Sequence, residues 1–249
     1  MTIHMKGKSL ASLYDLKKEE IEQVLKTSKL LKFRLLRREK HPLLKGKTLV
    51  MIFEKPSTRT RVSLEVGIWQ LGGYALYLSA GDLQLDRRET IADTAQVLSR
   101  YVDGIIARVF AHQTILDMVK YSRVPVINGL SYFTHPCQGL ADLFTIYEKK
   151  GRLSGLKLAY VGDGNNVAHS LLYGCSKVGM DITLACPKGY EPDPEVVSKA
   201  KEEGKRSGCE VKVTKDPKEA VRSADIVYAD IWASIGKEKE YKGISSQDR

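Results

Sequence analysis

The sequence predicts an α/β protein with two domains, each a parallel sheet flanked by helices. Short apolar runs alternate with amphipathic segments along almost the whole chain, as in repeated strand–helix units. A polar, glycine-containing segment near Gly151 interrupts the series and indicates a domain boundary. The motifs richest in chemistry fall just after predicted strands, where parallel sheets bind ligands. We therefore expect domains at residues 1–150 and 151–249.

The first domain begins with a helix whose apolar positions, from Ile21 to Leu35, follow helical spacing. A later helix places Val62, Val66 and Trp69 on one face. The other predicted elements are strands at 48–53, 74–78, 104–109 and 124–128, the last ended by an Asn-Gly pair, and helices at 90–101, 113–121 and 136–150.

The second domain is predicted to be Rossmann-like, because a strand runs directly into a glycine-containing turn and a helix. Its predicted strands are 156–161, 181–185, 210–214 and 225–229, and its helices run from the first turn to about 177, over 194–206 and onward from 216. The last predicted strand is followed by residues 230–249, which end in a polar stretch.

Composition excludes several classes of protein. The 249 residues are 43% hydrophobic and 28% charged, which is ordinary globular usage. No apolar run is long enough to span a membrane, no signal peptide begins the chain, and four scattered cysteines suit a reducing cytoplasm. The net charge of +10 allows nucleic-acid binding, but the densest basic run, residues 29–40, is better explained as a solvated helix face. We expect a cytoplasmic protein with no nucleic-acid or membrane partner.

The first chemical cluster is the run Pro56-Ser-Thr-Arg-Thr-Arg61, between a strand and a helix. A helix N-terminus attracts anions, and arginine forms paired hydrogen bonds with phosphate oxygens. A capped helix with two surface arginines is the alternative. Because three hydroxyls and two guanidinium groups gather in one short turn, we favour a phosphate site.

The second cluster is the run Thr134-His-Pro-Cys-Gln138, again between a strand and a helix. A neutral imidazole and an amide here could donate hydrogen bonds to a carbonyl group. Metal binding is disfavoured, because His135 and Cys137 have no further ligands at suitable spacing. A nucleophilic cysteine is disfavoured too, because nothing nearby would orient such a pair.

The third cluster, Gly162-Asp-Gly-Asn-Asn-Val167, resembles a dinucleotide fingerprint but departs from it. Val167 occupies the third glycine position, and the next strand does not end in an acidic residue. A nicotinamide or flavin cofactor is therefore disfavoured, and with it an oxidoreductase. The amides of Asn165 and Asn166 suit an amino-acid substrate instead.

The fourth cluster, residues 230–236, follows the last predicted strand. Asp230 could hold an ammonium group, and Ser234 with nearby backbone N–H groups could hold a carboxylate. A simple helix cap at Asp230 is the alternative. His169 is expected to be a packed helical residue, and the sequence favours surface or loop positions for His4, His41 and His112.

Together these clusters resemble the transcarbamoylase family, and within it the ornithine branch. The motifs that carry the resemblance are Ser57-Thr-Arg-Thr-Arg61, Gln84, Arg108, His135-Pro-Cys-Gln138, Gly162 to Ser170 and Asp230-Ile-Trp-Ala-Ser-Ile-Gly236. The resemblance implies transfer of the carbamoyl group from carbamoyl phosphate to L-ornithine, giving L-citrulline and phosphate in arginine metabolism. It implies no metal or organic cofactor, and a trimer or a multiple of trimers whose active sites lie at subunit interfaces.

The resemblance also implies residue roles. Arg59, Arg108 and His135 would be catalytic. The carbamoyl phosphate ligands would be Ser57, Thr58, Arg59, Thr60, Gln84, Arg108, His135 and Gln138. The ornithine ligands would be Asn166, Asp230, Ser234 and the backbone of Ile235.

One departure from the family concerns the end of the chain. The family continues with a His-Cys-Leu-Pro motif and a C-terminal helix, whereas this sequence stops at Arg249. We expect a shortened second domain. The alternative to an active enzyme is a catalytically impaired remnant that binds carbamoyl phosphate and acts as an oligomeric binding module.

Overall fold

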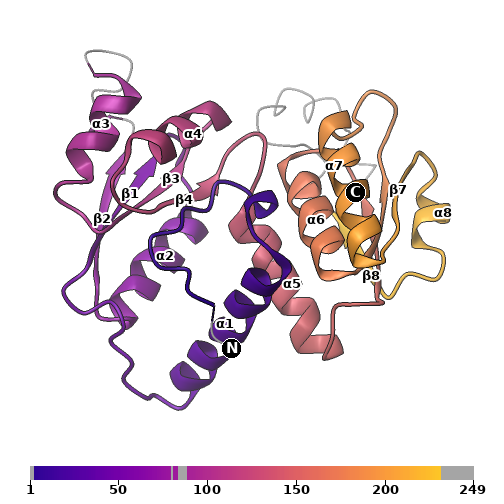
Figure 1. The fold of residues 1–249 in the computed structure, drawn as a ribbon, viewed down its shortest axis with the longest axis horizontal. Coiled ribbons are helices and arrows are strands. Elements are labelled where there is room, and N and C mark those ends of the chain that lie inside the picture. The colour runs from indigo at the N-terminus through magenta and orange to yellow at the C-terminus, as the bar shows by residue number, and fades with distance from the viewer. Residues whose placement is uncertain (1–2, 80, 84–88, 231–249) are drawn as a thin grey trace, which may run out of the picture. The chain divides into compact units, whose positions relative to one another are not determined.

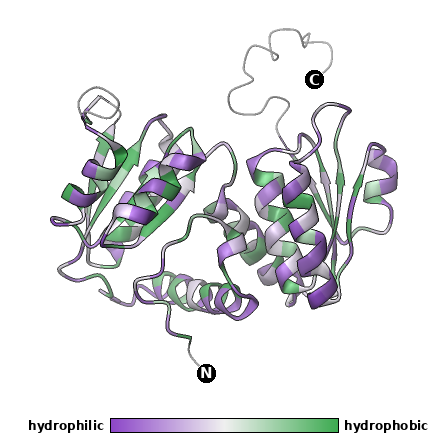
Figure 2. Ribbon diagram, turned by 45° about the horizontal axis from the view of Figure 1, so that its top comes forward, coloured by the Kyte–Doolittle hydropathy of each residue, from purple (hydrophilic) through white to green (hydrophobic). Residues whose placement is uncertain are grey.

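The computed structural model describes residues 3–79, 81–83 and 89–230. The chain divides into two compact units, Met1–Leu140 and Ala141–Arg249, each built on a parallel four-stranded sheet (Figure 1). Apolar residues concentrate on the strands of both sheets, and polar residues cover much of the helices' outer surfaces (Figure 2). The predicted fold class is confirmed.

The first unit contains a sheet of order β2-β1-β3-β4. The chain alternates between strands and helices to build it. Its elements are α1 (Lys18–Leu36), β1 (Thr48–Phe53), α2 (Thr58–Gln70), β2 (Tyr74–Ser79), α3 (Ile91–Leu98), β3 (Gly104–Arg108), α4 (His112–Tyr121), β4 (Val126–Leu130) and the start of α5 (Pro136–Lys150), with a short 3-10 turn at Leu13–Asp15.

The alternation of side chains along β1 divides the first core in two. Val50 and Ile52 face a cluster that includes Ala95 of α3 and Ile115 of α4. Met51 and Phe53 face the other side, where Ile68 of α2 packs. The α2 residues Val62, Val66 and Trp69 share a face as predicted, but that face is exposed, with Trp69 75% accessible.

The second unit contains a sheet of order β7-β6-β5-β8, also parallel throughout. Its elements after α5 are β5 (Lys157–Val161), α6 (Asn166–Val178), β6 (Asp181–Ala185), α7 (Pro194–Ser207), β7 (Val211–Thr214), α8 (Pro217–Val221) and β8 (Ile226–Ala229). Ala220 of α8 packs against Ala159 and Ala185.

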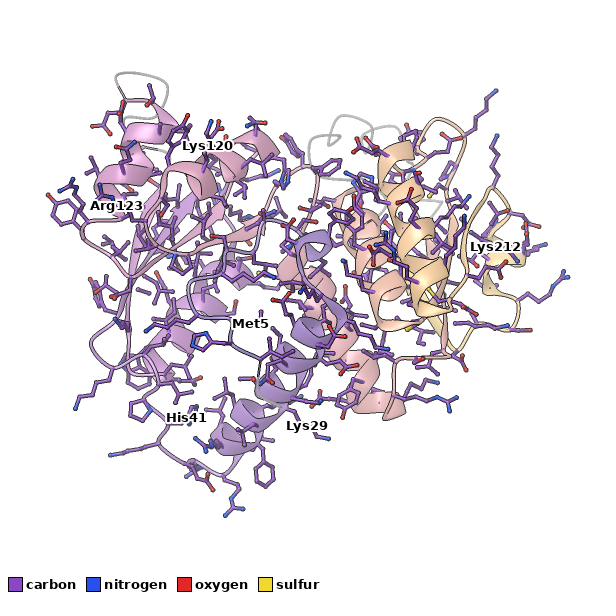
Figure 3. All side chains as sticks on the ribbon, viewed as in Figure 1. Met5, Lys29, His41, Lys120, Arg123 and Lys212 are labelled. Carbon is purple, nitrogen blue, oxygen red and sulfur yellow. The ribbon has the colours of Figure 1, made fainter. Side chains whose placement is uncertain are left out.

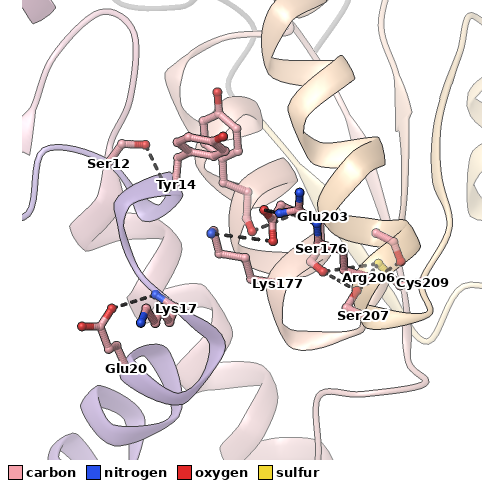
Figure 4. Close-up of polar contacts among 12 residues, drawn as sticks. Ser12, Tyr14, Lys17, Glu20, Ser176, Lys177, Glu203, Arg206, Ser207 and Cys209 are labelled. Atoms are coloured by element: carbon pink, nitrogen blue, oxygen red, sulfur yellow. Dashed lines mark hydrogen bonds and ion pairs between the residues drawn. The ribbon is translucent and has the colours of Figure 1, made fainter. Parts of the chain in front are cut away.

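Helices α6 and α7 are joined by polar contacts as well as by packing (Figure 4). The Ser207 hydroxyl donates to the carbonyl of Ser176, and Lys177 lies 3.9 Å from the Glu203 carboxylate. Glu203 also pairs with Arg206 at 2.9 Å. The contacts of Ser207 and Lys177 join the C-terminal parts of the two helices.

Strand β4 differs from the prediction. It runs from Val126 to Leu130, through the Asn128-Gly129 pair that was expected to end it. The register between β3 and β4 shifts beside Arg108, so that Arg108 pairs with Leu130. The N-terminal segment also lies along this strand, with Leu10 N–H donating to Val126 O at 2.8 Å. Helix α3 ends at Leu98, earlier than predicted.

The histidines fall in more than one environment. His4 is exposed as expected, and His169 is buried as expected, its Nε2 accepting from Asp193 N–H at 3.0 Å. His41, expected at a surface or loop position, lies in a loop but is buried, and it donates from Nδ1 to the Glu39 carbonyl at 2.6 Å. His112 is not in a loop but opens α4.

Exposed basic side chains are spread over separate elements. Lys29 lies on α1, Lys120 on α4 and Lys212 on β7 (Figure 3). The run 29–40 is largely exposed, as predicted, but the same helix also exposes Phe33 and Leu36. Among the described helices, none is long and apolar enough to cross a membrane.

Candidate functional site

The carboxyl edge of the first sheet gathers three of the predicted segments. Phe53, the last residue of β1, is in register with Arg108, the last residue of β3, and Arg108 is in register with Leu130 of β4. The segments that follow these strands must therefore emerge side by side. They are the 56–61 run, Arg108 itself and the 134–138 run.

The first segment forms the start of helix α2. Ser57 is the N-cap residue, with an extended backbone, and its side chain makes no capping bond. Its hydroxyl instead donates to Thr60 Oγ1 at 3.0 Å. Since the first N–H groups of a helix have no partner within the helix, this turn offers backbone donors to an anion.

The two arginines of this turn differ. Arg61 is used within the unit: its guanidinium lies 3.7 Å from the centre of the Tyr77 ring, and Nε is 3.0 Å from the Glu65 carboxylate. Arg59 is exposed and forms no ion pair with another described residue. Arg61 is therefore already engaged within the unit, whereas Arg59, the arginine of this turn that the resemblance assigns to phosphate, is exposed.

Glu54 ties this turn to the next strand, a role that the sequence did not indicate. Its backbone N–H donates to Arg108 O at 2.9 Å, and its carboxylate accepts from Phe110 N–H at 2.6 Å. The segments after β1 and β3 are thereby held together.

Arg108 and His135 are the two titratable side chains at the centre of this edge. Arg108 is 7% exposed, and its buried Nε has no hydrogen-bond partner among the described residues. Burial lowers the pKa of Arg108. Burial, and secondly the charge of Arg108, lower the pKa of His135 to about 4. The imidazole is therefore neutral near pH 7, and a neutral imidazole can still donate one N–H to a carbonyl oxygen.

A buried amide supports the segment that leads to His135. The Asn128 side chain is fully buried, and its amide donates to Ala11 O at 2.9 Å and to Thr134 Oγ1 at 3.1 Å. Ser131 Oγ accepts from Thr134 N–H at 3.2 Å and lies 2.9 Å from His112 Nδ1. The sequence missed this network, because the Asn-Gly pair indicated only a turn.

Cys137 and Gln138 begin helix α5 beside His135. The Cys137 thiol donates to Asn128 O at 3.5 Å, and burial raises its pKa to about 11. Such a thiol carries almost no thiolate at neutral pH, so it is a poor nucleophile. Gln138 is partly buried on the first turn of the same helix.

Three predicted residues lie outside the described part of the structure. They are Gln84, Ser234 and Ile235.

In the second unit, Asp230 follows β8 directly, and its N–H continues the ladder by donating to Val161 O at 3.1 Å. Its carboxylate oxygen Oδ2 accepts from the Tyr160 hydroxyl at 2.8 Å and also from the Asn165 amide. Asn165 is the N-cap of α6. Its neighbour Asn166, the predicted ligand, is the first residue of that helix and is buried. The structure thus brings Asp230 to the helix start.

The glycines of the 162–167 run accommodate the protein's own chain. A Cβ on Gly164 would lie 2.1 Å from the Pro192 nitrogen, and Gly164 N–H donates to Tyr190 O at 2.7 Å. A Cβ on Gly162 would lie 2.8 Å from the Asp230 Cβ. Residues 190–192 therefore fill the space beside Gly164 that the pyrophosphate of a dinucleotide would have to occupy.

A pocket of about 430 Å³ lies at the carboxyl edge of the second sheet. It is bordered by the ends of the strands and the loops that follow them. Its lining residues are Val161, Gly162, Asp163, Ala185, Cys186, Pro187, Lys215, Pro217, Ala229 and Asp230. Across the described ranges, no group of three or more His, Cys, Asp or Glu side chains is arranged to hold a metal ion.

Comparison with known proteins gives two family matches. Residues 8–148 match the model described as aspartate/ornithine carbamoyltransferase, carbamoyl-P binding domain, and residues 154–247 match the Asp/Orn binding domain of the same name.

Individual proteins agree with these matches. The chain is 57% identical to the ornithine carbamoyltransferase of Thermococcus kodakarensis, covering 96% of this chain and 76% of that protein. The corresponding Bacillus subtilis enzyme is 54% identical, covering 94% and 72%. The solved structure of the Pyrococcus furiosus enzyme superposes with a TM-score of 0.93 at 54% identity, covering 97% and 77%.

Proposed function

This chain belongs to the aspartate/ornithine carbamoyltransferase family of enzymes, and from that premise we propose that it transfers the carbamoyl group of carbamoyl phosphate to the side-chain amine of L-ornithine. The products would be L-citrulline and phosphate, a step of arginine metabolism. The choice of ornithine over aspartate is supported by the names of the similar proteins. It is supported further by Asp230, a carboxylate that suits an ammonium group and repels an acidic acceptor.

The observation that carries the proposal is the carboxyl edge of the first sheet. A helix start with exposed Arg59, a buried Arg108 and a neutral His135 come from adjacent strands there. We assign the carbamoyl phosphate to this edge, in a domain of residues 1–150. Its ligands would be Ser57, Thr58, Arg59, Thr60, Gln84, Arg108, His135 and Gln138. The ornithine domain would be residues 151–249, with Asn166, Asp230, Ser234 and Ile235 as ligands.

The chemistry needs no covalent enzyme intermediate. The neutral amine attacks the carbamoyl carbon, a C–N bond forms, and the C–O bond to phosphate breaks with its electron pair leaving on phosphate. The amine nitrogen loses a proton, which the departing phosphate can accept. Negative charge grows on the carbonyl oxygen and on the leaving phosphate, where Arg59, Arg108 and the His135 N–H would stabilise it. Alignment of the two substrates supplies much of the remaining acceleration.

We also propose a homo-oligomer built on trimers and a cytoplasmic location. The exposed apolar face of α2, with Val62 52% and Trp69 75% accessible, supports an interface between copies of the chain. The four cysteines are free thiols, which suits a reducing compartment.

The direct test is a citrulline assay with purified protein, carbamoyl phosphate and either ornithine or aspartate, paired with calorimetry for carbamoyl phosphate. Citrulline formation with a wide preference for ornithine is expected. Carbamoyl phosphate binding without citrulline would favour the non-catalytic binding module, and preferred use of aspartate would place the chain in the other branch.

A further inference from the structure

The carboxylate of Asp230 is held by two neutral donors from different elements. The Tyr160 hydroxyl, near the end of β5, donates to Oδ2 at 2.8 Å, and the Asn165 amide donates to the same oxygen. Because both bonds reach Oδ2, they fix the rotation of the carboxylate. The position of its second oxygen, Oδ1, is fixed at the same time.

Tyr160 is well placed to hold this geometry rigidly. Its side chain is fully buried, and its ring stacks on Tyr228 with centroids 5.7 Å apart. The single hydroxyl hydrogen lies within reach of both the Asp230 carboxylate and the Asp163 carbonyl, each at 2.8 Å. The charged acceptor is the stronger of the two. Burial, and secondly the Asp230 charge, raise the pKa of Tyr160 far above its ordinary value, so the phenol stays a donor.

Asn165 has two separable tasks. Its Oδ1 accepts from Val167 N–H at 2.9 Å and from Ala168 N–H at 3.3 Å, which caps α6. Its Nδ2 donates to Asp230. The Asn165 side chain therefore couples the Asp230 carboxylate to the start of α6. The first residue of that helix is Asn166, one of the proposed ornithine ligands.

We propose that Tyr160 and Asn165 are positioning residues that aim the Asp230 carboxylate at the ammonium group of the amino-acid substrate. This proposal rests on the proposed function, since it needs an acceptor with an ammonium group at Asp230. It goes beyond that function by assigning substrate recognition to a phenol and an amide that need not touch the substrate.

A purely structural role makes a different prediction. If the contacts only hold β5 and α6 against β8, their loss would lower stability and weaken the binding of ornithine and carbamoyl phosphate alike. If they aim Asp230, their loss would raise the KM for ornithine while the Kd for carbamoyl phosphate is unchanged. Comparing the KM for ornithine with the Kd for carbamoyl phosphate therefore distinguishes a positioning role from a purely structural one.

The experiment uses the full chain with three substitutions. Tyr160→Phe removes only the hydroxyl. Asn165→Ser keeps a good helix cap but removes the donor to Asp230. Tyr228→Phe is the matched control, because it removes a hydroxyl from the ring stacked on Tyr160 and has no described bond to Asp230. Each variant is assayed for citrulline formation, for carbamoyl phosphate binding by calorimetry and for thermal unfolding.

We expect the KM for ornithine to rise roughly tenfold in Tyr160→Phe and Asn165→Ser, as for the loss of one hydrogen bond to a charged group. Tyr228→Phe should stay within about twofold of the parent. Calorimetry with L-norvaline, which has an α-amino-acid end but no side-chain amine, gives a readout without turnover. Its affinity, measured with carbamoyl phosphate saturating, should fall by a similar factor if Asp230 holds the α-ammonium group.

The outcomes are distinct. An unchanged KM for ornithine in both variants would overturn the proposal. An equal weakening of ornithine and carbamoyl phosphate binding would overturn it as well. If Tyr160→Phe does not fold, Asn165→Ser decides alone. Failure of the parent protein to make citrulline would instead count against the proposed function, which separates the two failures.

Discussion

The candidate site in the first unit uses side chains that carry their own charge, whereas the candidate site in the second unit directs one carboxylate with neutral donors. In the first, Arg59 is exposed at a helix start and Arg108 is buried at a strand end. In the second, a phenol and an amide hold Asp230. The first site therefore depends on having its arginine charges present, whereas the second depends on how the single carboxylate of Asp230 is oriented.

This difference suits the two proposed ligands. A phosphate group is doubly charged and nearly symmetric, so several cations and backbone donors can bind it from different directions. An amino-acid end has one ammonium group that must be met from a single direction, because the attacking amine sits at the other end of the molecule. We therefore expect substitutions in the first unit to affect turnover and carbamoyl phosphate binding, and those in the second to affect the acceptor.

The largest expected effect is that of Arg59→Ala. We expect kcat to fall by roughly 100- to 1000-fold, the usual result of removing one donor to transition-state charge, and carbamoyl phosphate binding to weaken. Stability should change little, because Arg59 is exposed. Steady-state kinetics and calorimetry measure these effects.

Arg61→Ala is the matched control. It removes a guanidinium from the same turn, but one engaged with Tyr77 and Glu65. We expect a loss of about 1 kcal/mol in stability and rates within about threefold of the parent. An equal fall in kcat in Arg59→Ala and Arg61→Ala would show that the two arginines do not have different roles.

The second prediction concerns His135 and pH. Its pKa is about 4 in the folded unit and near 6.5 when unfolded. Between these values the unfolded chain binds the extra proton, so stability falls as pH falls from about 6.5 toward 4 and is fully present above that window. The difference of about 2.5 between these two pKa values limits this contribution to about 3 kcal/mol. Urea unfolding at several pH values should show it, and His135→Gln should flatten that part of the profile.

The catalytic consequence of the same shift is equally testable. Since His135 stays neutral above pH 5, its titration should not appear in kcat/KM for ornithine near neutral pH. The rate should instead rise with pH, because the substrate amine must lose its proton to attack. A change of slope near pH 6.5 that disappears in His135→Gln would contradict the shifted pKa.

The third prediction sharpens the comparison in the second unit. Asp230→Asn keeps the shape of the side chain but removes its charge, and we expect the KM for ornithine to rise roughly 10- to 100-fold. The Kd for carbamoyl phosphate should remain within about twofold, since its proposed ligands lie on the other sheet. A comparable loss of carbamoyl phosphate binding would show that the two sites are not separable in this way.

The fold was predictable because the signals that specify it are local. Alternating apolar runs located nearly every strand, and capping residues such as Asn165 and Asp193 begin helices close to the expected positions. The exception is instructive. Asn128-Gly129 has the local signature of a turn, yet Asn128 stays in β4 because its amide is satisfied by Ala11, far away in the sequence.

The site was predictable to a smaller extent for the same reason. The strand ends located the segments that carry Arg59, Arg108, His135 and Asp230, and their assignment as ligands stays a proposal. The sequence could not show that the Arg61 guanidinium would stack on the Tyr77 ring, nor that the Tyr160 hydroxyl would bond to the Asp230 carboxylate. Both contacts join segments that only the folded sheet brings together.

The smallest expected effect is that of Cys137→Ala, which tests whether the first site contains a nucleophile. Cys137 lies two residues after His135, a spacing that invites comparison with thiol enzymes. Its thiol, however, donates to the Asn128 carbonyl, and its pKa is raised to about 11, so the thiolate is scarce at neutral pH. Direct attack by the substrate amine needs no such group. We therefore expect kcat within about threefold of the parent and a modest loss of stability, of about 1 kcal/mol, from the lost packing and hydrogen bond. Rapid-quench measurements should show no burst of phosphate without ornithine. A burst in the parent protein that Cys137→Ala abolishes would establish a carbamoyl–thiol intermediate and replace direct attack with a two-step mechanism.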